Sequence, residues 1–163
     1  MTSLKKIFLI TTALYFPFCA SAEEYSSRID TPGVSFELAQ KRKAEIKDVR
    51  YQLFFQIPET KSTPIKGEES ICFSFNKDIS NVVIDFNAEN SQLKKVEVNG
   101  NQVPFTFQNE HIILNSTIFS HRDNKITISF IAGDKPLNRN IDYLYTLFVP
   151  DHARQAFPCF DQP

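Results

Sequence analysis

From residue 49 onward, apolar and polar residues alternate with the period of two that is typical of β-strands. Residues 49–57 show this clearly and predict a strand with one buried face, ended by Pro58. The apolar positions of that face are Val49, Tyr51, Leu53, Phe55 and Ile57. Further strands are predicted over residues 65–75, 81–87, 93–98, 103–107, 111–114, 125–131 and 142–148. Many short strands without strand–helix–strand alternation predict an all-β fold, an antiparallel sandwich or saddle.

Two local signals add to this pattern. Thr31-Pro32-Gly33 is typical of a helix start, with Thr31 as N-cap and Pro32 in the first helical position. A short helix is therefore predicted over residues 34–43, ahead of the first strand. Asn99-Gly100 predicts a hairpin turn, because both residues tolerate positive φ.

The first 22 residues have the pattern of an export signal. Lys5-Lys6 forms a basic start, residues 7–18 are apolar but too few to span a bilayer comfortably, and Ala20-Ser21-Ala22 is a cleavage site of the A-x-A type. We expect a mature chain that begins at Glu23, has no membrane span and is periplasmic or extracellular. A membrane anchor is the alternative, which the small residues before Glu23 disfavour.

The chain is therefore expected to have three parts. Residues 1–22 are the signal peptide, residues 23–33 a polar tail and helix start, and residues 34–163 a single β-domain. Loss of the signal removes two lysines and no acid, which changes the net charge from −1 to −3. Such a mildly acidic chain is a poor candidate for nucleic-acid binding. The one basic triplet, Lys41-Arg42-Lys43, is predicted to be a solvated helix end.

Residues 153–163 carry the most specific motif of the chain. They read Ala-Arg-Gln-Ala-Phe-Pro-Cys-Phe-Asp-Gln-Pro and closely resemble the Ala-Arg-x-x-Phe-Pro-Cys-Phe-Asp-Glu/Gln-Pro signature of the M1 family of zinc aminopeptidases, the aminopeptidase N family. Residues 142–151 resemble the strand that leads into this signature, and residues 49–53 and 65–67 resemble the family's opening hairpin. The resemblance covers residues 34–163.

The resemblance implies the N-terminal β-domain of such an enzyme, incomplete at its C-terminal side and truncated before the catalytic domain. The family holds zinc through His-Glu-x-x-His and a downstream Glu. The histidines of this chain, His111, His121 and His152, are not followed by Glu and have no i, i+4 spacing. We therefore expect no catalytic, metal-binding or cofactor-binding residues and no peptidase activity in this chain. The resemblance implies that zinc is held in the full-length parent, that the partner is the missing zinc peptidase domain, and that peptide substrate is reached only through the parent.

The residues of the motif are expected to be mainly structural. Phe157 and Phe160 are predicted to pack into the core, Asp161 to accept local backbone hydrogen bonds and Arg154 to pair with a carboxylate. The resemblance implies a packing role for Cys159. The motif residues taken together are Arg154, Phe157, Pro158, Cys159, Phe160, Asp161, Gln162 and Pro163. Its two prolines fix the backbone in a turn.

One part of the family pattern is not matched. The strand before the motif carries Gln-x-Glu in many M1 enzymes, and its carboxylate helps to hold the free α-amine of the substrate. Leu147 and Val149 occupy those positions here. An ammonium-binding carboxylate is therefore not expected from this strand.

The motif leaves a second hypothesis open. The chain could be a stand-alone exported β-sandwich that binds a peptide, a glycan or a protein partner. The sequence also leaves open whether Cys72 and Cys159 form a disulfide, since geometry decides that. A late acidic set of Asp134, Asp142, Asp151 and Asp161 is more consistent with solvated turns than with an acid/base pair.

Overall fold

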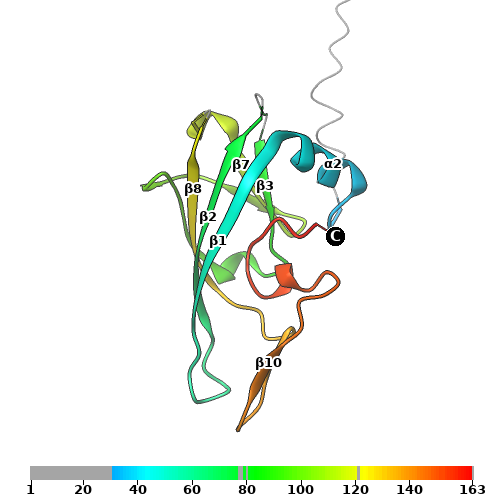
Figure 1. Ribbon diagram of the computed structural model, residues 1–163. Coiled ribbons are helices and arrows are strands. Elements are labelled where there is room, and N and C mark those ends of the chain that lie inside the picture. The colour runs from blue at the N-terminus through cyan, green and yellow to red at the C-terminus, as the bar shows by residue number, and fades with distance from the viewer. Residues whose placement is uncertain (1–30, 77–78, 80, 121, 163) are drawn as a thin grey trace, which may run out of the picture.

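Two antiparallel sheets pack face to face in the part of the chain that the computed structural model describes, residues 31–76, 79, 81–120 and 122–162 (Figure 1). The larger sheet has five strands. In spatial order they are β1 (Ile46–Gln56), β2 (Lys66–Phe75), β8 (Asn124–Ile131), β4 (Leu93–Val98) and β5 (Asn101–Gln102). Every neighbouring pair in this sheet is antiparallel.

The smaller sheet faces the larger one across the core. Its strands, in spatial order, are β3 (Asn81–Asp85), β7 (His111–Asn115) and β6 (Thr106–Gln108). A separate hairpin pairs β9 (Leu137–Arg139) with β10 (Leu144–Thr146) and extends away from the two sheets in Figure 1. The prediction of an antiparallel all-β sandwich is confirmed.

The core follows from the alternation of side chains along the strands. The larger sheet contributes the inward residues of β2, β8 and β4, and the smaller sheet those of β3 and β7. Fully buried examples are Ile71, Ile126, Ile128, Ile84, Ile112 and Leu114. Each such side chain stabilises the fold by about 1.5–3 kcal/mol relative to an exposed one.

The face predicted for the first strand is only partly covered. Phe55 is half-buried, but Val49, Tyr51, Leu53 and Ile57 remain 38%, 40%, 37% and 52% exposed. The reason is the position of β1, which lies at the edge of its sheet and pairs within the described residues only with β2. The prediction of a buried face was therefore wrong for these residues.

The predicted start of the helix was wrong, and the predicted hairpin turn was right. Helix α2 (Phe36–Glu45) begins later than predicted, because Ser35 is the N-cap and its hydroxyl accepts a hydrogen bond from Leu38 N at 3.1 Å. Gly33, with φ 93°, lies outside the helix, so Thr31 does not cap it. The hairpin at Asn99-Gly100 is confirmed, since both residues have positive φ and join β4 to β5.

Five short elements were not predicted. They are β5, β9 and the 3₁₀ turns η1 (Asn90–Gln92), η2 (Ser116–Ile118) and η3 (Ala153–Gln155). The strand predicted over residues 103–107 was wrong for residues 103–105, which lie between β5 and β6. The predicted signal peptide, most of the polar tail, His121 and Pro163 lie outside the described residues. Within the residues that are described, no helix has the length and apolarity needed to cross a membrane.

Candidate functional site

The terminal segment, residues 153–162, lies between the edges of the two sheets beside helix α2 (Figure 1). It begins with η3 and then pairs with the free side of β3 through one antiparallel bridge. Asp85 N donates to Cys159 O at 2.8 Å, and Cys159 N donates to Asp85 O at 2.9 Å. The segment therefore extends the smaller sheet at β3.

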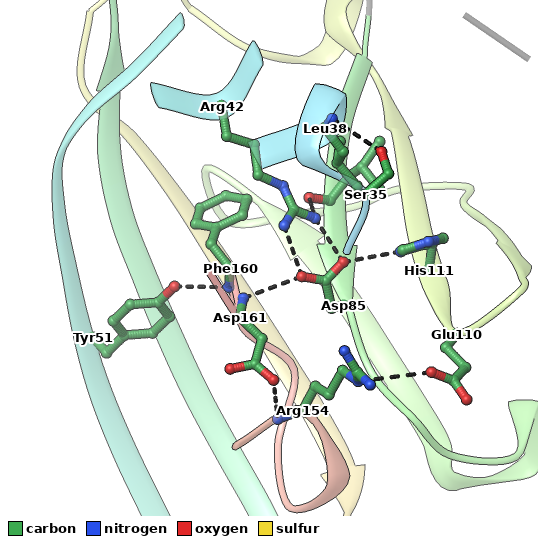
Figure 2. A network of polar contacts seen from close by, with 11 residues as sticks. Ser35, Leu38, Arg42, Tyr51, Asp85, Glu110, His111, Arg154, Phe160 and Asp161 are labelled. Carbon is green, nitrogen blue, oxygen red and sulfur yellow. Dashed lines mark hydrogen bonds and ion pairs between the residues drawn. The ribbon is translucent and has the colours of Figure 1, made fainter. Parts of the chain in front are cut away.

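Asp85 is the centre of a buried polar network that holds this segment. Arg42 of α2 donates to both carboxylate oxygens, at 2.7 and 2.6 Å, and to Val83 O at 2.9 Å. His111 Nδ1 lies 2.9 Å from Oδ1, and Asp161 N donates to Oδ2 at 3.1 Å. Figure 2 shows these groups converging on one carboxylate from α2, β7 and the terminal segment.

The network keeps a charged carboxylate in the core. Asp85 is 0% exposed, and burial alone would raise its pKa. The hydrogen bond with His111 and the two-pronged ion pair with Arg42 outweigh burial and hold the pKa of Asp85 below its usual range. The basic triplet was therefore wrongly predicted as wholly solvated, because Arg42 is buried against Asp85.

The side chains of the terminal segment fill the gap between the sheets. Phe157 is buried in the core, and Phe160 packs against its rim with the Arg42 guanidinium 5.4 Å from the ring centre. Pro158 and Cys159 are buried, and Phe160 N donates to the Tyr51 hydroxyl of β1 at 2.9 Å. The segment thus contacts α2, β1 and β3 together.

Polar contacts fix the start of the segment. The Arg154 side chain lies 3.7 Å from the Glu110 carboxylate and 3.5 Å from that of Asp151. Its backbone N donates to Asp161 Oδ2 at 3.4 Å, and Asp161 is half-buried. Burial raises the pKa of Asp161, opposed by the contacts with Arg154. Gln162 is exposed, and its contact is a backbone bond to Phe160 O.

An exposed row of apolar side chains precedes the terminal segment. It consists of Ile141, Tyr143, Tyr145, Leu147 and Val149, which are 93%, 60%, 54%, 57% and 72% exposed. We call these five residues the apolar row. The rings of Tyr143 and Tyr145 stack at 6.3 Å between centroids. The two positions that depart from the family pattern, Leu147 and Val149, are therefore surface residues.

A cavity adjoins the apolar row. It has a volume of about 400 Å³ and is lined by Tyr145 and Leu147 from the row and by His152 and Gln155 from the neighbouring turn, among others. Gln155 Nε2 lies 3.0 Å from His152 Nδ1. Its lining also includes Lys135 and Asn138, so it offers apolar, polar and cationic contacts.

The remaining predicted candidates are not brought together. His111 is in the Asp85 network and His152 contacts Gln155, while Asp134 pairs with Arg139 at 3.4 Å. In the described part of the chain, no three His, Cys, Asp or Glu side chains are grouped so as to hold a metal ion. Cys72 is half-buried, Cys159 is buried, and both are free thiols.

The fold recurs in solved zinc peptidases. Native yeast leukotriene A4 hydrolase matches with a TM-score of 0.62 and 20% identity over 88% of this chain and 25% of its own. The enzyme described as native leukotriene A4 hydrolase from Saccharomyces cerevisiae matches with 0.59 and 17% over 73% and 22%, and an M1 zinc metallopeptidase from Deinococcus radiodurans with 0.53 and 17% over 73% and 30%. The sequence matches no family model and no curated protein.

These comparisons confirm the fold that the terminal motif implied. The chain has a fold that is found within M1 zinc metallopeptidases, and it spans about a quarter of the length of the solved structures that it matches.

Proposed function

We propose that this chain is the non-catalytic N-terminal β-domain of an exported zinc aminopeptidase of the M1 family, which removes N-terminal residues from peptides. The observation that carries the proposal is the shared fold over 73–88% of this chain, against only 22–30% of the zinc peptidases. The Phe-Pro-Cys-Phe-Asp-Gln-Pro motif supports it independently. Export is proposed from the basic, apolar and small-residue pattern of residues 1–22.

The zinc of such an enzyme does not fit the described residues of this chain. His111 Nδ1 is engaged by Asp85 in the core, and His152 Nδ1 is engaged by Gln155. A catalytic zinc needs three converging protein ligands and an open position for water. We therefore assign the metal and the hydrolytic chemistry to the peptidase domain of a full-length parent.

The apolar row is the surface that we assign to the contact with that peptidase domain. Five exposed apolar side chains in alternate positions are typical of an interaction surface. The row adjoins the terminal segment, since Leu147 and Gln155 line the same cavity. In this proposal the domain helps to close the substrate cleft, and peptide contacts it only within the parent.

The chain by itself is expected to be inactive. The purified protein should not cleave aminoacyl-naphthylamides and should not retain stoichiometric zinc after dialysis, because the sequence has no His-Glu-x-x-His. Zinc analysis and a fluorogenic peptidase assay check this. Sequencing the DNA beyond codon 163 is the complementary test, where a reading frame that encodes His-Glu-x-x-His supports the proposal. Zinc-dependent cleavage by this chain alone would refute it.

Polar substitutions in the apolar row should separate surface from core. Leu147→Ser with Val149→Ser is expected to change the free energy of unfolding by no more than about 0.5 kcal/mol, because both side chains are exposed. The same variant should bind less of a hydrophobic dye and self-associate less in sedimentation. Phe54→Ser, at an exposed apolar residue outside the apolar row, is the matched control and should leave self-association unchanged. Severe destabilisation would instead place these residues in the core.

A stand-alone binding module remains the second proposal. The observation in its favour is a cavity of about 450 Å³ on the outer face of the larger sheet. Its lining includes the exposed ring of Phe54 beside Gln56, Lys66, Glu68, Lys94 and Ser129. An aromatic ring flanked by such polar groups suits a sugar or a peptide. Binding of either ligand to this face in titration experiments would favour the second proposal.

A further inference from the structure

Glu69 occupies a core position where an apolar side chain is expected. It points to the same face of β2 as Gly67 and Ile71, both buried, and the strand register sets it between Leu53 and Ile128. Its side chain is 1% exposed, and neither carboxyl oxygen has a hydrogen-bond partner among the described residues. An ionised carboxylate without a partner is so costly in the core that the acid keeps its proton instead.

The groups that face Glu69 do not compensate a negative charge. Its carboxyl acts electrostatically on Tyr51 of β1 and on Cys159 of the terminal segment. Burial raises the pKa of both the Tyr51 hydroxyl and the Cys159 thiol, so both are neutral near pH 7. On the side of β8, the facing residue is the apolar Ile128. Burial likewise raises the pKa of Glu69 well above its usual range.

The positively charged or ionisable groups that lie further from Glu69 are already bound by another carboxylate. Arg42 of α2 also acts on Tyr51 and Cys159, but its guanidinium is bound by Asp85 of β3 at 2.6 and 2.7 Å. His111 of β7 is held by the same carboxylate, at 2.9 Å. Asp161 of the terminal segment adds negative charge near Cys159. An ionised Glu69 would therefore meet more negative charge and no available cation in this network.

We propose that Glu69 is a protonation-controlled latch, which keeps the terminal segment closed over the larger sheet while neutral and releases that segment when it ionises. Water can reach the Glu69 carboxylate with least disruption from the side of β1, the strand that pairs with β2 at the edge of the sheet. β1 is an edge strand, where Tyr51 and Leu53 are already 40% and 37% exposed. Parting the segment from β1 breaks the bond from Phe160 N to the Tyr51 hydroxyl and leaves the β2–β8 pairing intact. Local opening of this kind is cheaper than global unfolding.

The direction of the pH effect follows from the raised pKa. The stability that neutral Glu69 contributes is fully present below its unfolded pKa of about 4.3 and is lost as the pH rises through its folded pKa. Between these two pKa values the opening equilibrium increases by up to about tenfold for each pH unit, and it levels off above the folded pKa. The latch is thus closed in acid and opens toward alkaline pH.

Thiol labelling at Cys159 tests the latch in the full chain. With Cys19→Ser and Cys72→Ser, Cys159 is the only cysteine left. Its labelling rate, divided by the rate in the same protein with Glu69→Gln, should be constant in acid. The ratio should increase by up to about tenfold per pH unit between about pH 4.3 and the folded pKa of Glu69, and should level off above that pKa. The Glu69→Gln protein corrects for the ionisation of the thiol itself. Glu68→Gln, at the exposed neighbour, is the matched control and should behave like the parent protein.

Two further measurements cover the possibility that Glu69→Gln does not fold. Glu69→Leu removes the titrating group, so its labelling rate should lack the increase with pH that Glu69 causes in the parent protein. In the unsubstituted chain, carbon-13 NMR of labelled glutamates should show one carboxyl that titrates far above the ordinary range of about 4 to 5. Parallel labelling profiles with and without Glu69, or glutamates that all titrate in the ordinary range, would overturn the proposal.

Discussion

Replacing Asp85 with alanine is expected to destabilise the domain by about 3–5 kcal/mol, because it leaves a buried guanidinium without its counter-ion. Arg42 is 5% exposed and would keep only its contact with Val83 O among the bonds described here. Asp161 N would lose its acceptor as well. A loss of this size is a large part of the stability of a small domain. Urea denaturation followed by circular dichroism measures it.

The pH dependence separates the charge of Asp85 from its shape. Because its folded pKa is lowered, its stabilising contribution is present above the unfolded pKa of about 3.9 and is lost as the pH falls through the folded pKa. Asp85→Asn should therefore remove this part of the acid sensitivity. Glu97→Gln, which breaks the more exposed Lys95–Glu97 pair, should cost at most about 1 kcal/mol. Equal losses from both sites would contradict the central role of Asp85.

Replacing Gly133 with alanine is the second change with a large expected effect. A Cβ atom at Gly133 would lie 1.8 Å from the backbone oxygen of Gln155, so the η3 turn would have to move. Overpacking of this kind typically costs about 1–3 kcal/mol, which exceeds the usual gain of about 0.4–1 kcal/mol from glycine to alanine. The displaced turn begins the terminal segment, so Cys159 should also become easier to label.

Gly100→Ala provides the comparison for this substitution. A Cβ atom there meets nothing within 4 Å, and the cost is backbone strain at φ 84°, about 1–2 kcal/mol. Labelling of Cys159, measured with Cys19→Ser and Cys72→Ser, should therefore rise in Gly133→Ala and stay unchanged in Gly100→Ala. Unchanged labelling in Gly133→Ala would mean that the terminal segment is not held by this contact.

Sequence patterns predicted the strands well because local alternation reports which face of a strand is buried. The hairpin at Asn99-Gly100 was equally local, since the turn itself requires positive φ. Whether the face of β1 is buried could not be predicted from the local sequence. Val49, Tyr51 and Leu53 have the alternation of a buried face, but burial depends on which strands lie beside them.

The Asp85 network could not be predicted for the same reason. Arg42 and Asp85 are 43 positions apart, and nothing near either residue in the sequence announces the other. One signal was present: Asp85 directly follows the apolar run Val82-Val83-Ile84, where a charged residue must find a partner if it is buried. Glu69 gave a similar signal within the alternation of β2, yet its position has no partner to find among the described residues.

The span of these contacts has a consequence for the order of folding. Arg42 can be neutralised only after β3 has formed, and Asp85 is fully coordinated only once Asp161, 76 positions further on, has arrived. The bond between Phe160 and Tyr51 closes a loop of 109 positions. Contacts of such sequence separation form slowly, because the chain entropy must be lost before they are made. During synthesis, helix α2 therefore leaves the ribosome long before the residues that will hold it in place.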